Sequence, residues 1–246
     1  MNQPHPEPPE LWHSLTEVAR ALLESQQLLL ARPLLRRIPR GDGHPVMTLP
    51  GFGGADGCMA PLRVWLKRWG YDARPWNLGR NFPKYRMTSL DAATHFREKM
   101  VMRAGRELEK IYRETGQKVS LIGWSMGGLY AHELGQQHPE WVRQVITLGT
   151  PHGDPRGTAA WDMMRKLYNS EVPEDMQDVT GWVATNSETV EVPVTVIFSP
   201  TDGIVSQEVA MLRHADVNHL AVNSSHLGFA LNPRVYRLIG KQLARF

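Results

Sequence analysis

One serine in this chain stands between two glycines at a spacing that exposes a nucleophile. Ser125 follows the apolar run of residues 119–123 and precedes an amphipathic run, so the pattern predicts a strand, a sharp turn and a helix. Gly123 and Gly127 lie two positions before and after the serine, where a tight turn leaves no room for a side chain. The pattern therefore predicts that the Ser125 hydroxyl projects above a sheet edge at the start of a helix.

Two further residues complete a constellation for acyl transfer. A serine hydroxyl is a poor nucleophile until a base takes its proton, and a histidine needs a carboxylate to fix its tautomer and stabilise its cation. Asp202 follows the predicted strand 193–198, and His226 follows the predicted strand 217–222. We expect Ser125, Asp202 and His226 to meet, because the carboxyl ends of parallel strands share one edge.

Other histidines and acids are weaker candidates for these roles. His152 and Asp154 also follow a predicted strand, but they precede Asp202 and occupy a Gly/Pro turn whose expected role is structural. Asp216 begins a strand, so it is expected at the far edge of the sheet. The remaining candidates are expected to be structural histidines: His132, His214 and His219.

A glycine-rich loop, residues 50–54, follows the predicted strand 45–49. It lacks the Lys-Ser/Thr ending of a phosphate-binding loop and the glycine spacing of a dinucleotide site, which argues against nucleotide binding. Glycines let the main chain approach a ligand closely. The Phe52 N–H group is therefore predicted to form half of an oxyanion hole.

The order of elements predicts an α/β fold with a mostly parallel central sheet and helices on both faces. Residues 1–246 are expected to form a single domain with a helical N-terminal extension over residues 1–42. Strand and helix alternation breaks over residues 154–191, which read either as a lid or cap over the site or as an ordinary subdomain. The aromatic loop of residues 76–86 forms either a wall for an apolar substrate or cover for the core.

The first predicted helix, residues 11–31, has apolar residues near helical spacing, and two interpretations of that face remain open. We expect the face to pack on the domain's own core. The alternative is contact with a membrane surface or a partner, supported by the nearby cluster Arg32, Arg36, Arg37 and Arg40. The apolar positions concerned are Leu11, Leu15, Val18, Leu22 and Leu29.

Composition excludes several other classes of function. The 246 residues carry a net charge of +3 that is mostly scattered, so nucleic acid is not an expected partner. The single cysteine, Cys58, excludes an internal disulfide, and no paired His and carboxylate spacing indicates a metal. We expect no cofactor. No secretory signal or membrane-spanning apolar run is apparent, and a cytoplasmic location is the resulting expectation.

The sequence resembles the α/β-hydrolase superfamily, and its lipase- and esterase-like members most closely, over about residues 43–246. The motifs that carry the resemblance are Leu49-Pro50-Gly51-Phe52-Gly53-Gly54, Gly123-Trp124-Ser125-Met126-Gly127-Gly128, Gly149-Thr150-Pro151-His152-Gly153, Asp202-Gly203 and Ser225-His226. Trp124 departs from the pattern, since a histidine often stands beside the serine in this superfamily.

The resemblance implies Ser125 as nucleophile, His226 as general base and Asp202 as the group that orients it. It also implies an oxyanion hole formed by the backbone N–H groups of Phe52 and Met126, with Gly51, Gly123 and Gly127 in the structural turns. The implied reaction is hydrolysis of a small-molecule or lipid-like carboxylic ester through an acyl-enzyme. An acyltransferase, thioesterase or amidase with the same triad, or a non-catalytic binding module on this scaffold, stays open.

Overall fold

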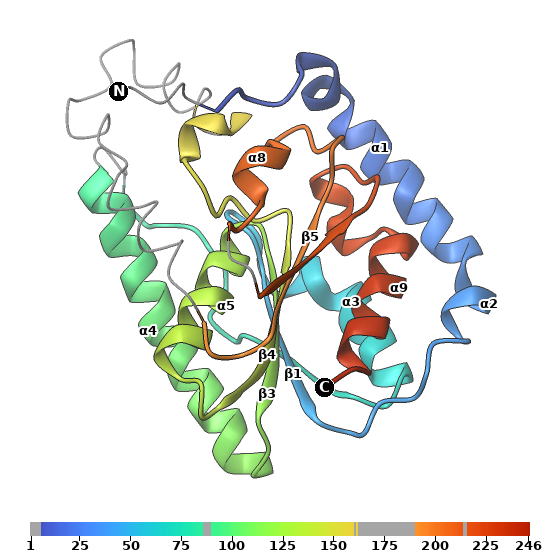
Figure 1. Ribbon diagram of the computed structural model, residues 1–246, viewed down its shortest axis with the longest axis vertical. Coiled ribbons are helices and arrows are strands. Elements are labelled where there is room, and N and C mark those ends of the chain that lie inside the picture. The colour runs from blue at the N-terminus through green and yellow to red at the C-terminus, as the bar shows by residue number, and fades with distance from the viewer. Residues whose placement is uncertain (1–5, 86–89, 160, 162–189, 214–215) are drawn as a thin grey trace.

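Six parallel strands form the centre of the computed structural model, which describes residues 6–85, 90–159, 161, 190–213 and 216–246 (Figure 1). The strand order is β2-β1-β3-β4-β5-β6. Three of the six strands are buried along their whole length and a fourth at every position but Arg143, as is typical of a parallel sheet covered on both faces. The strands are β1 (Pro45–Leu49), β2 (Asp72–Pro75), β3 (Val119–Trp124), β4 (Val142–Leu148), β5 (Val194–Phe198) and β6 (Val217–Ala221).

The direction in which strands are added to the sheet reverses between β1 and β3. The chain places β2 on one side of β1 and then crosses to place β3 on the other side, with Leu49 in register with Gly123. A crevice for ligands forms beyond the carboxyl ends of the strands at such a switch point. The loop after β1 and the turn after β3 therefore meet at this point of the sheet edge.

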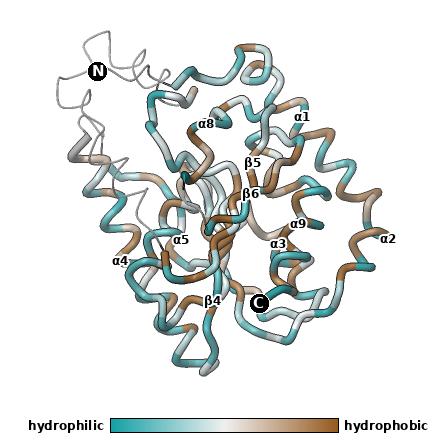
Figure 2. The backbone as a smooth tube through the Cα atoms, in the orientation of Figure 1, coloured by the Kyte–Doolittle hydropathy of each residue, from teal (hydrophilic) through white to brown (hydrophobic). Residues whose placement is uncertain are grey.

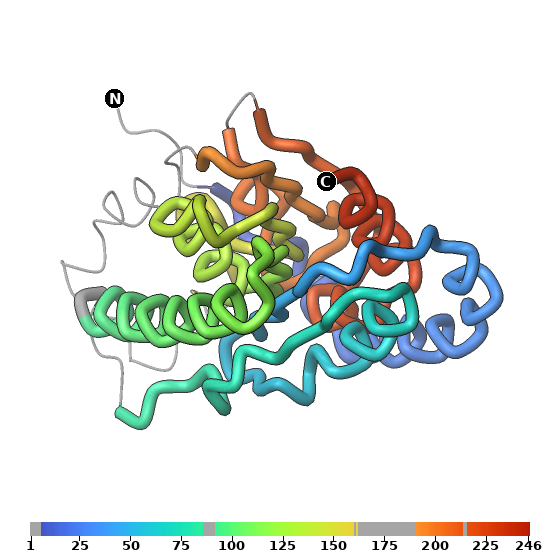
Figure 3. The backbone as a smooth tube through the Cα atoms, turned by 90° about the horizontal axis from the view of Figure 1, so that it is seen from below, coloured from blue at the N-terminus to red at the C-terminus, as the bar shows by residue number. Residues whose placement is uncertain are grey.

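Helices cover both faces of the sheet (Figures 1 and 3). One face packs on α4 and α5 around a core that includes Trp76, Leu108 and Tyr130, and the other packs on α3 and α9 around Leu62, Phe229 and Tyr236. The helices are α1 (Leu11–Leu30), α2 (Arg32–Leu35), α3 (Asp56–Arg68), α4 (Leu90–Thr115), α5 (Met126–Gln137), α8 (Gln207–Ala210) and α9 (Pro233–Leu243), with the 3-10 turns η1 (Pro155–Gly157) and η3 (Leu227–Ala230).

The N-terminal helix is correctly predicted, but the expectation that its apolar face packs on the core is wrong. Helix α1 turns Glu17, Ala21, Glu24 and Leu28 toward the protein. The five apolar residues expected in the core are all more than half exposed: Leu11, Leu15, Val18, Leu22 and Leu29. The two glutamates find backbone and side-chain donors inside the protein, so the polar side of the helix makes the better contact.

Two predicted element boundaries also need correction. The sequence predicts a helix over residues 61–69 that begins at Pro61, but α3 begins five residues earlier, at Asp56, and contains Pro61 in its interior. The sequence also predicts that residues 209–214 are part of a helix. The structure has only the short α8 here, and the chain is not helical from Met211 to Arg213. Most of the predicted lid, residues 154–191, lies outside the described residues, and its role stays a prediction.

Candidate active site at the carboxyl edge of the sheet

Ser125 occupies a strained turn between β3 and α5. Its backbone has φ of 53° and ψ of −126°, a combination that L-residues rarely adopt. Its N–H group donates to Leu148 O at 2.8 Å, which fixes the turn to the end of β4. A Cβ atom at Gly123 would collide with the backbone of Gly127, and one at Gly127 would collide with Leu49 O. Both glycines are therefore required by close packing, as the sequence predicts.

The loop after β1 lies directly against this turn. A Cβ atom on Gly51 would come within 3.0 Å of Ser125 Cβ, so the next residue, Phe52, lies beside the serine. Within the described part of the chain, the backbone N–H groups of Phe52 and Met126 have no protein acceptor. Two free donors next to one hydroxyl have the make-up of an oxyanion-binding site.

Asn81, which belongs to no motif of the sequence, holds this loop in place. It is fully buried, and its side-chain amide donates to Pro50 O at 3.0 Å. Its backbone N–H donates to Gly54 O, and its backbone carbonyl accepts from Gly53 N, both at 2.7 Å. Its Oδ1 accepts the Tyr130 hydroxyl at 3.0 Å. These bonds fix the loop that carries the Phe52 N–H.

His226 and Asp202 form a buried pair at the same sheet edge. His226 Nδ1 and Asp202 Oδ2 are 2.8 Å apart, and each residue is 3% exposed. The other carboxylate oxygen, Asp202 Oδ1, accepts the backbone N–H groups of Ile204 at 2.8 Å and Val205 at 2.9 Å. The carboxylate is therefore fixed on one side by the backbone and receives the Nδ1 proton on the other. This leaves His226 Nε2 as the nitrogen that can accept a proton from a nucleophile.

The surroundings raise the pKa of His226 above its ordinary value of 6.5. Burial opposes the charged imidazolium, but the negative charge of Asp202, its hydrogen bond and the charge of Glu17 outweigh that effect. Among the hydrogen bonds of the described residues, none joins Ser125 Oγ to His226. In apo structures, hydrogen bonds of this kind are often long and tighten only when substrate binds.

Trp124, the residue before the nucleophile candidate, supports the loop that carries His226. Its indole N–H donates to His226 O at 3.0 Å, and the two rings lie 5.9 Å apart. This hydrogen bond thus ties the residue before the nucleophile to the loop that carries the base. A tryptophan N–H buried beside a carbonyl is also satisfied, which makes the large side chain acceptable at this position.

Glu17 on α1 reaches into the site from the N-terminal extension. Its Oε1 accepts the backbone N–H groups of Gly203 at 2.8 Å and His226 at 2.9 Å, and its Oε2 accepts that of Leu227 at 3.1 Å. One carboxylate therefore joins the loop that follows Asp202 to the loop that carries His226.

Glu24, seven residues after Glu17 on α1, fixes Ser225, the residue before His226. It accepts the Ser225 N–H at 2.9 Å and the Ser225 hydroxyl at 2.6 Å, and it receives the Asn232 amide at 3.3 Å. One feature of the sequence indicates that these two glutamates face the protein. Two acids seven residues apart share one face of a helix that is otherwise rich in leucine.

The structure gives the alternative candidates other surroundings. His152 is buried, with Nε2 3.1 Å from the Thr147 hydroxyl and its ring against His132. Burial and neighbouring positive charge hold the pKa of His152 well below 6.5. Asp154 pairs with Arg156, and Asp216 is exposed at the start of β6. His219 lies on β6 within the sheet, and His214 lies outside the described residues.

Aromatic side chains form part of the surface around the glycine-rich loop. Phe52 and Phe82 are each about half exposed, with ring centroids 5.2 Å apart. Tyr85 is also exposed, whereas Trp76 is fully buried in the core. Trp76 thus covers the core, as one interpretation of residues 76–86 predicts, whereas a wall for an apolar substrate formed by Phe82 and Tyr85 stays a prediction.

No cluster of histidine, cysteine, aspartate and glutamate in the described ranges has the arrangement of a metal site. Within those same ranges, no helix combines the length and the apolar character that crossing a bilayer requires.

Solved structures of similar shape place this architecture among the α/β-hydrolases. A monoacylglycerol lipase from Paleococcus ferrophilus superposes with a TM-score of 0.57 over 84% of this chain and 95% of that chain, at 16% identity. A lipase from Bacillus licheniformis, BlEst2, gives a TM-score of 0.58 over 85% and 95%, at 18% identity. The fold is thus that of the α/β-hydrolase superfamily, as the sequence motifs predict.

Sequence comparison narrows the assignment further. Residues 84–225 match the PGAP1-like alpha/beta domain, and the chain belongs to that family. A pimeloyl-[acyl-carrier protein] methyl ester esterase from Yersinia enterocolitica is 33% identical over 91 residues, which are 35% of each chain. The matched region thus spans about a third of the length of the curated relatives. These similarities support an esterase- or lipase-like α/β-hydrolase.

Proposed function

We propose that this protein is a serine hydrolase that cleaves carboxylic esters, with Ser125 as nucleophile, His226 as general base and Asp202 as the residue that orients the base. The observation that carries the proposal is the buried 2.8 Å pair of His226 and Asp202 at the sheet edge where the strained turn presents Ser125. The similarity to an esterase supports the substrate class.

The proposed reaction has two halves. Ser125 Oγ attacks the acyl carbonyl while its proton passes to His226 Nε2, and the N–H groups of Phe52 and Met126 bind the oxyanion. The tetrahedral species collapses, His226 returns the proton to the leaving alcohol, and an acyl-enzyme remains. Water then gives a proton to His226 and attacks the same carbonyl. The second tetrahedral species collapses, His226 returns that proton to Ser125 Oγ, and the acid leaves.

Enzymes with other acceptors or leaving groups use the same residues. An acyltransferase replaces water with an alcohol, and a thioesterase or amidase changes the bond that breaks. A non-catalytic module on this scaffold is a further alternative. It accounts poorly for the strain retained at Ser125 and for the free N–H groups beside it, since neither stabilises the fold.

A panel of substrates separates these functions. We expect hydrolysis of p-nitrophenyl esters from acetate to palmitate, with slower turnover of the matching thioester and anilide. Adding an alcohol acceptor is expected to yield little transesterified product. A preference for the thioester, the anilide or transfer to the alcohol would replace the ester hydrolase with that alternative, and turnover of none would favour the binding module.

The pH dependence of kcat/KM is expected to show an acid limb with its midpoint above pH 6.5. The neutral imidazole is the active base, and kcat/KM reports the pKa of the free enzyme. The raised pKa of His226 therefore moves the loss of activity upward from the ordinary value. The measurement is kcat/KM for a soluble ester from about pH 5 to 9. An acid limb centred below pH 6, or a flat profile, would indicate a different base.

Glu17→Gln is expected to lower kcat/KM by roughly tenfold and to move the acid limb to lower pH. The substitution removes a negative charge that raises the pKa of His226. It also places an amide N–H₂ opposite a backbone donor, because Gly203 and His226 donate to one carboxylate oxygen and Leu227 donates to the other. Glu17 is thus proposed as a positioning residue, and the pH profile is the test.

Glu24→Gln is the matched control on the same helix. Glu24 contacts the Ser225 hydroxyl, which can reverse its role as donor, and the charges that raise the pKa of His226 are those of Asp202 and Glu17. We expect a lower unfolding temperature and an unchanged acid limb. Equal shifts of the acid limb in both variants, or none in Glu17→Gln, would leave Glu17 with a structural role alone.

A further inference from the structure

Helix α1 is amphipathic in the direction opposite to that of most surface helices. Its buried residues include both of its acids, Glu17 and Glu24. Its exposed residues are apolar apart from Gln26 and Gln27: Leu11, Trp12, Leu15, Val18, Ala19, Leu22, Leu23, Leu29 and Leu30. At 100° per residue these positions cover roughly half of the helix circumference. No charged side chain of α1, all of whose residues are described, lies on this exposed half.

The exposure is large and continuous along the helix. Leu15 is 72% exposed, Leu22 is 61% exposed and Leu30 is 81% exposed, and Leu34 extends the surface onto α2. Helix α1 lies outside α9 and η3 at the edge of the molecule, as two views show (Figures 1 and 3). Brown segments recur along α1 in Figure 2. Single exposed leucines are ordinary on a protein surface, but a whole helix face of them marks an interaction site.

Positive charge lies beside this apolar face at its C-terminal end and on α9, whereas Glu7 and Glu10 are exposed just before its N-terminal end. Residues 11–41 contain only two acids, Glu17 and Glu24, both buried, and residues 217–246 contain none. The same two stretches carry eight exposed cations: Arg32, Arg36, Arg37, Arg40, Arg234, Arg237, Lys241 and Arg245. Helix α9, which supplies three of them, contacts both α1 and α2.

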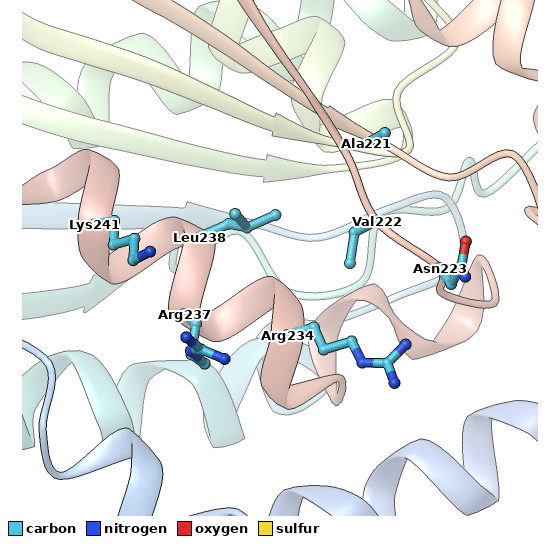
Figure 4. A pocket seen from close by; sticks show the side chains of 7 residues that line it. All are labelled: Ala221, Val222, Asn223, Arg234, Arg237, Leu238 and Lys241. Atoms are coloured by element: carbon cyan, nitrogen blue, oxygen red, sulfur yellow. The ribbon is translucent and has the colours of Figure 1, made fainter.

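Figure 4 shows part of this basic region. Arg234, Arg237 and Lys241 of α9 line a hollow of about 420 Å³ beside the end of β6, together with Leu238. The hollow contains no candidate nucleophile, so it is not part of the proposed active site. Its three cations instead enlarge the positive surface next to α1.

We propose that the apolar face of α1 docks on an anionic lipid surface, with the helix parallel to the membrane and the neighbouring arginines against the headgroups. An interfacial helix combines an apolar face with nearby cations, and a tryptophan such as Trp12 is suited to the headgroup boundary. A symmetric contact with a second copy would bring two sets of the same cations together, which disfavours that occupant.

Docking would bring the proposed active site close to the membrane. The first turn of α1 touches the loop that follows Asp202, since Ser14 Oγ donates to Gly203 O at 2.6 Å. Arg20 likewise donates to Thr201 O at 2.7 Å. The N-terminal end of the docking helix therefore lies beside the carboxyl edge of the sheet. This inference does not require the chain to be an esterase.

Vesicle flotation tests the proposal with the full chain. The probes are phosphatidylcholine vesicles with and without about 30% phosphatidylglycerol, at low and high salt. We expect binding to the anionic vesicles that weakens with salt, and little binding to phosphatidylcholine alone. An absence of binding to the anionic vesicles at low salt would overturn the proposal.

Two double variants test whether vesicle binding depends on the apolar face of α1 or on exposed apolar side chains anywhere on the surface. Leu15→Gln with Leu22→Gln is expected to weaken binding to the anionic vesicles by roughly 30-fold. The matched control is Val64→Gln with Met102→Gln, which removes two half-exposed apolar side chains from α3 and α4 and is expected to leave binding unchanged. Equal losses in both variants would contradict docking through α1. Thermal unfolding and hydrolysis of a soluble ester verify that each variant is folded.

The charges are tested by Arg32→Gln, Arg36→Gln and Arg37→Gln together. This variant is expected to lose roughly tenfold or more of its affinity at low salt. Size-exclusion chromatography of the wild type tests whether a second copy or another protein occupies the apolar face of α1 instead of a lipid surface. If the wild type does not bind vesicles but forms a dimer that Leu15→Gln with Leu22→Gln dissociates, a second copy would replace the lipid surface as the occupant. If the wild type does not bind vesicles but binds a protein that the same double variant releases, that protein would be the occupant.

Discussion

Replacing Ser125 with alanine is expected to lower kcat for ester hydrolysis by about 10⁶-fold while leaving the fold intact. The loss is this large because the hydroxyl forms the covalent intermediate, which no neighbouring group replaces. The strained backbone is unchanged by the substitution, since alanine is also an L-residue at φ of 53°. Initial rates and denaturant unfolding of the same preparation measure both quantities. A folded Ser125→Ala protein with even a tenth of the wild-type rate would exclude Ser125 as nucleophile.

Ser125→Gly is a second variant that measures the cost of the backbone strain at this position. Glycine adopts positive φ without the cost of about 1 to 3 kcal/mol that other residues bear outside the common regions, although it loses more entropy on folding. We therefore expect an equally inactive protein whose free energy of unfolding is about 1 kcal/mol higher. This result would indicate that the fold tolerates strain at Ser125 for the sake of its reaction.

Asp202→Asn is expected to lower kcat by about 10⁴-fold with the packing preserved. Asp202 Oδ1 accepts two backbone N–H groups, so an asparagine must keep its oxygen on that side. Its amide N–H₂ then faces His226 Nδ1, which has to accept rather than donate. The imidazole proton moves to Nε2, and the histidine can no longer take the Ser125 proton.

The kinetics of Asp202→Asn, with the thermal unfolding temperature, test this reasoning. The tautomer itself is observable in nitrogen chemical shifts of His226, which are expected to show protonated Nε2 in the variant and protonated Nδ1 in the wild type. A variant with near wild-type kcat would mean that another acid orients His226. His152 is the obvious residue to test next as base if His226 also proves dispensable.

The sequence was sufficient for the parts of this site that depend on local pattern or strand order. The turn around Ser125 is recognisable because the glycines that its packing requires are neighbours of the serine. Asp202 and His226 were predictable because parallel strands deliver their carboxyl ends to one edge, and the structure brings their side chains together at 2.8 Å. The roles assigned to these residues in catalysis stay predictions.

The orientation of α1 was not predictable by the same reasoning. Helical periodicity indicates which residues share a face, but it does not say whether that face turns inward. The deciding partners of Glu17 and Glu24 are backbone groups about 200 positions further along the chain. Those groups become available only after the sheet has brought the loop before η3 beside the helix. The role of Asn81 was not predicted for a similar reason, since its partners lie in the loop that follows β1, far from Asn81 in the sequence.

Covalent labelling with a fluorophosphonate probe tests the central claim most directly. A fluorophosphonate reacts with a serine only when a base removes the hydroxyl proton and donors hold the oxyanion-like phosphoryl oxygen. Intact mass followed by peptide mapping is expected to show one adduct per chain, located on Ser125. Labelling should be lost in Ser125→Ala and strongly slowed in Asp202→Asn. An unlabelled folded wild-type protein, or an adduct on another residue, would contradict the assignment of Ser125, His226 and Asp202 as the catalytic machinery.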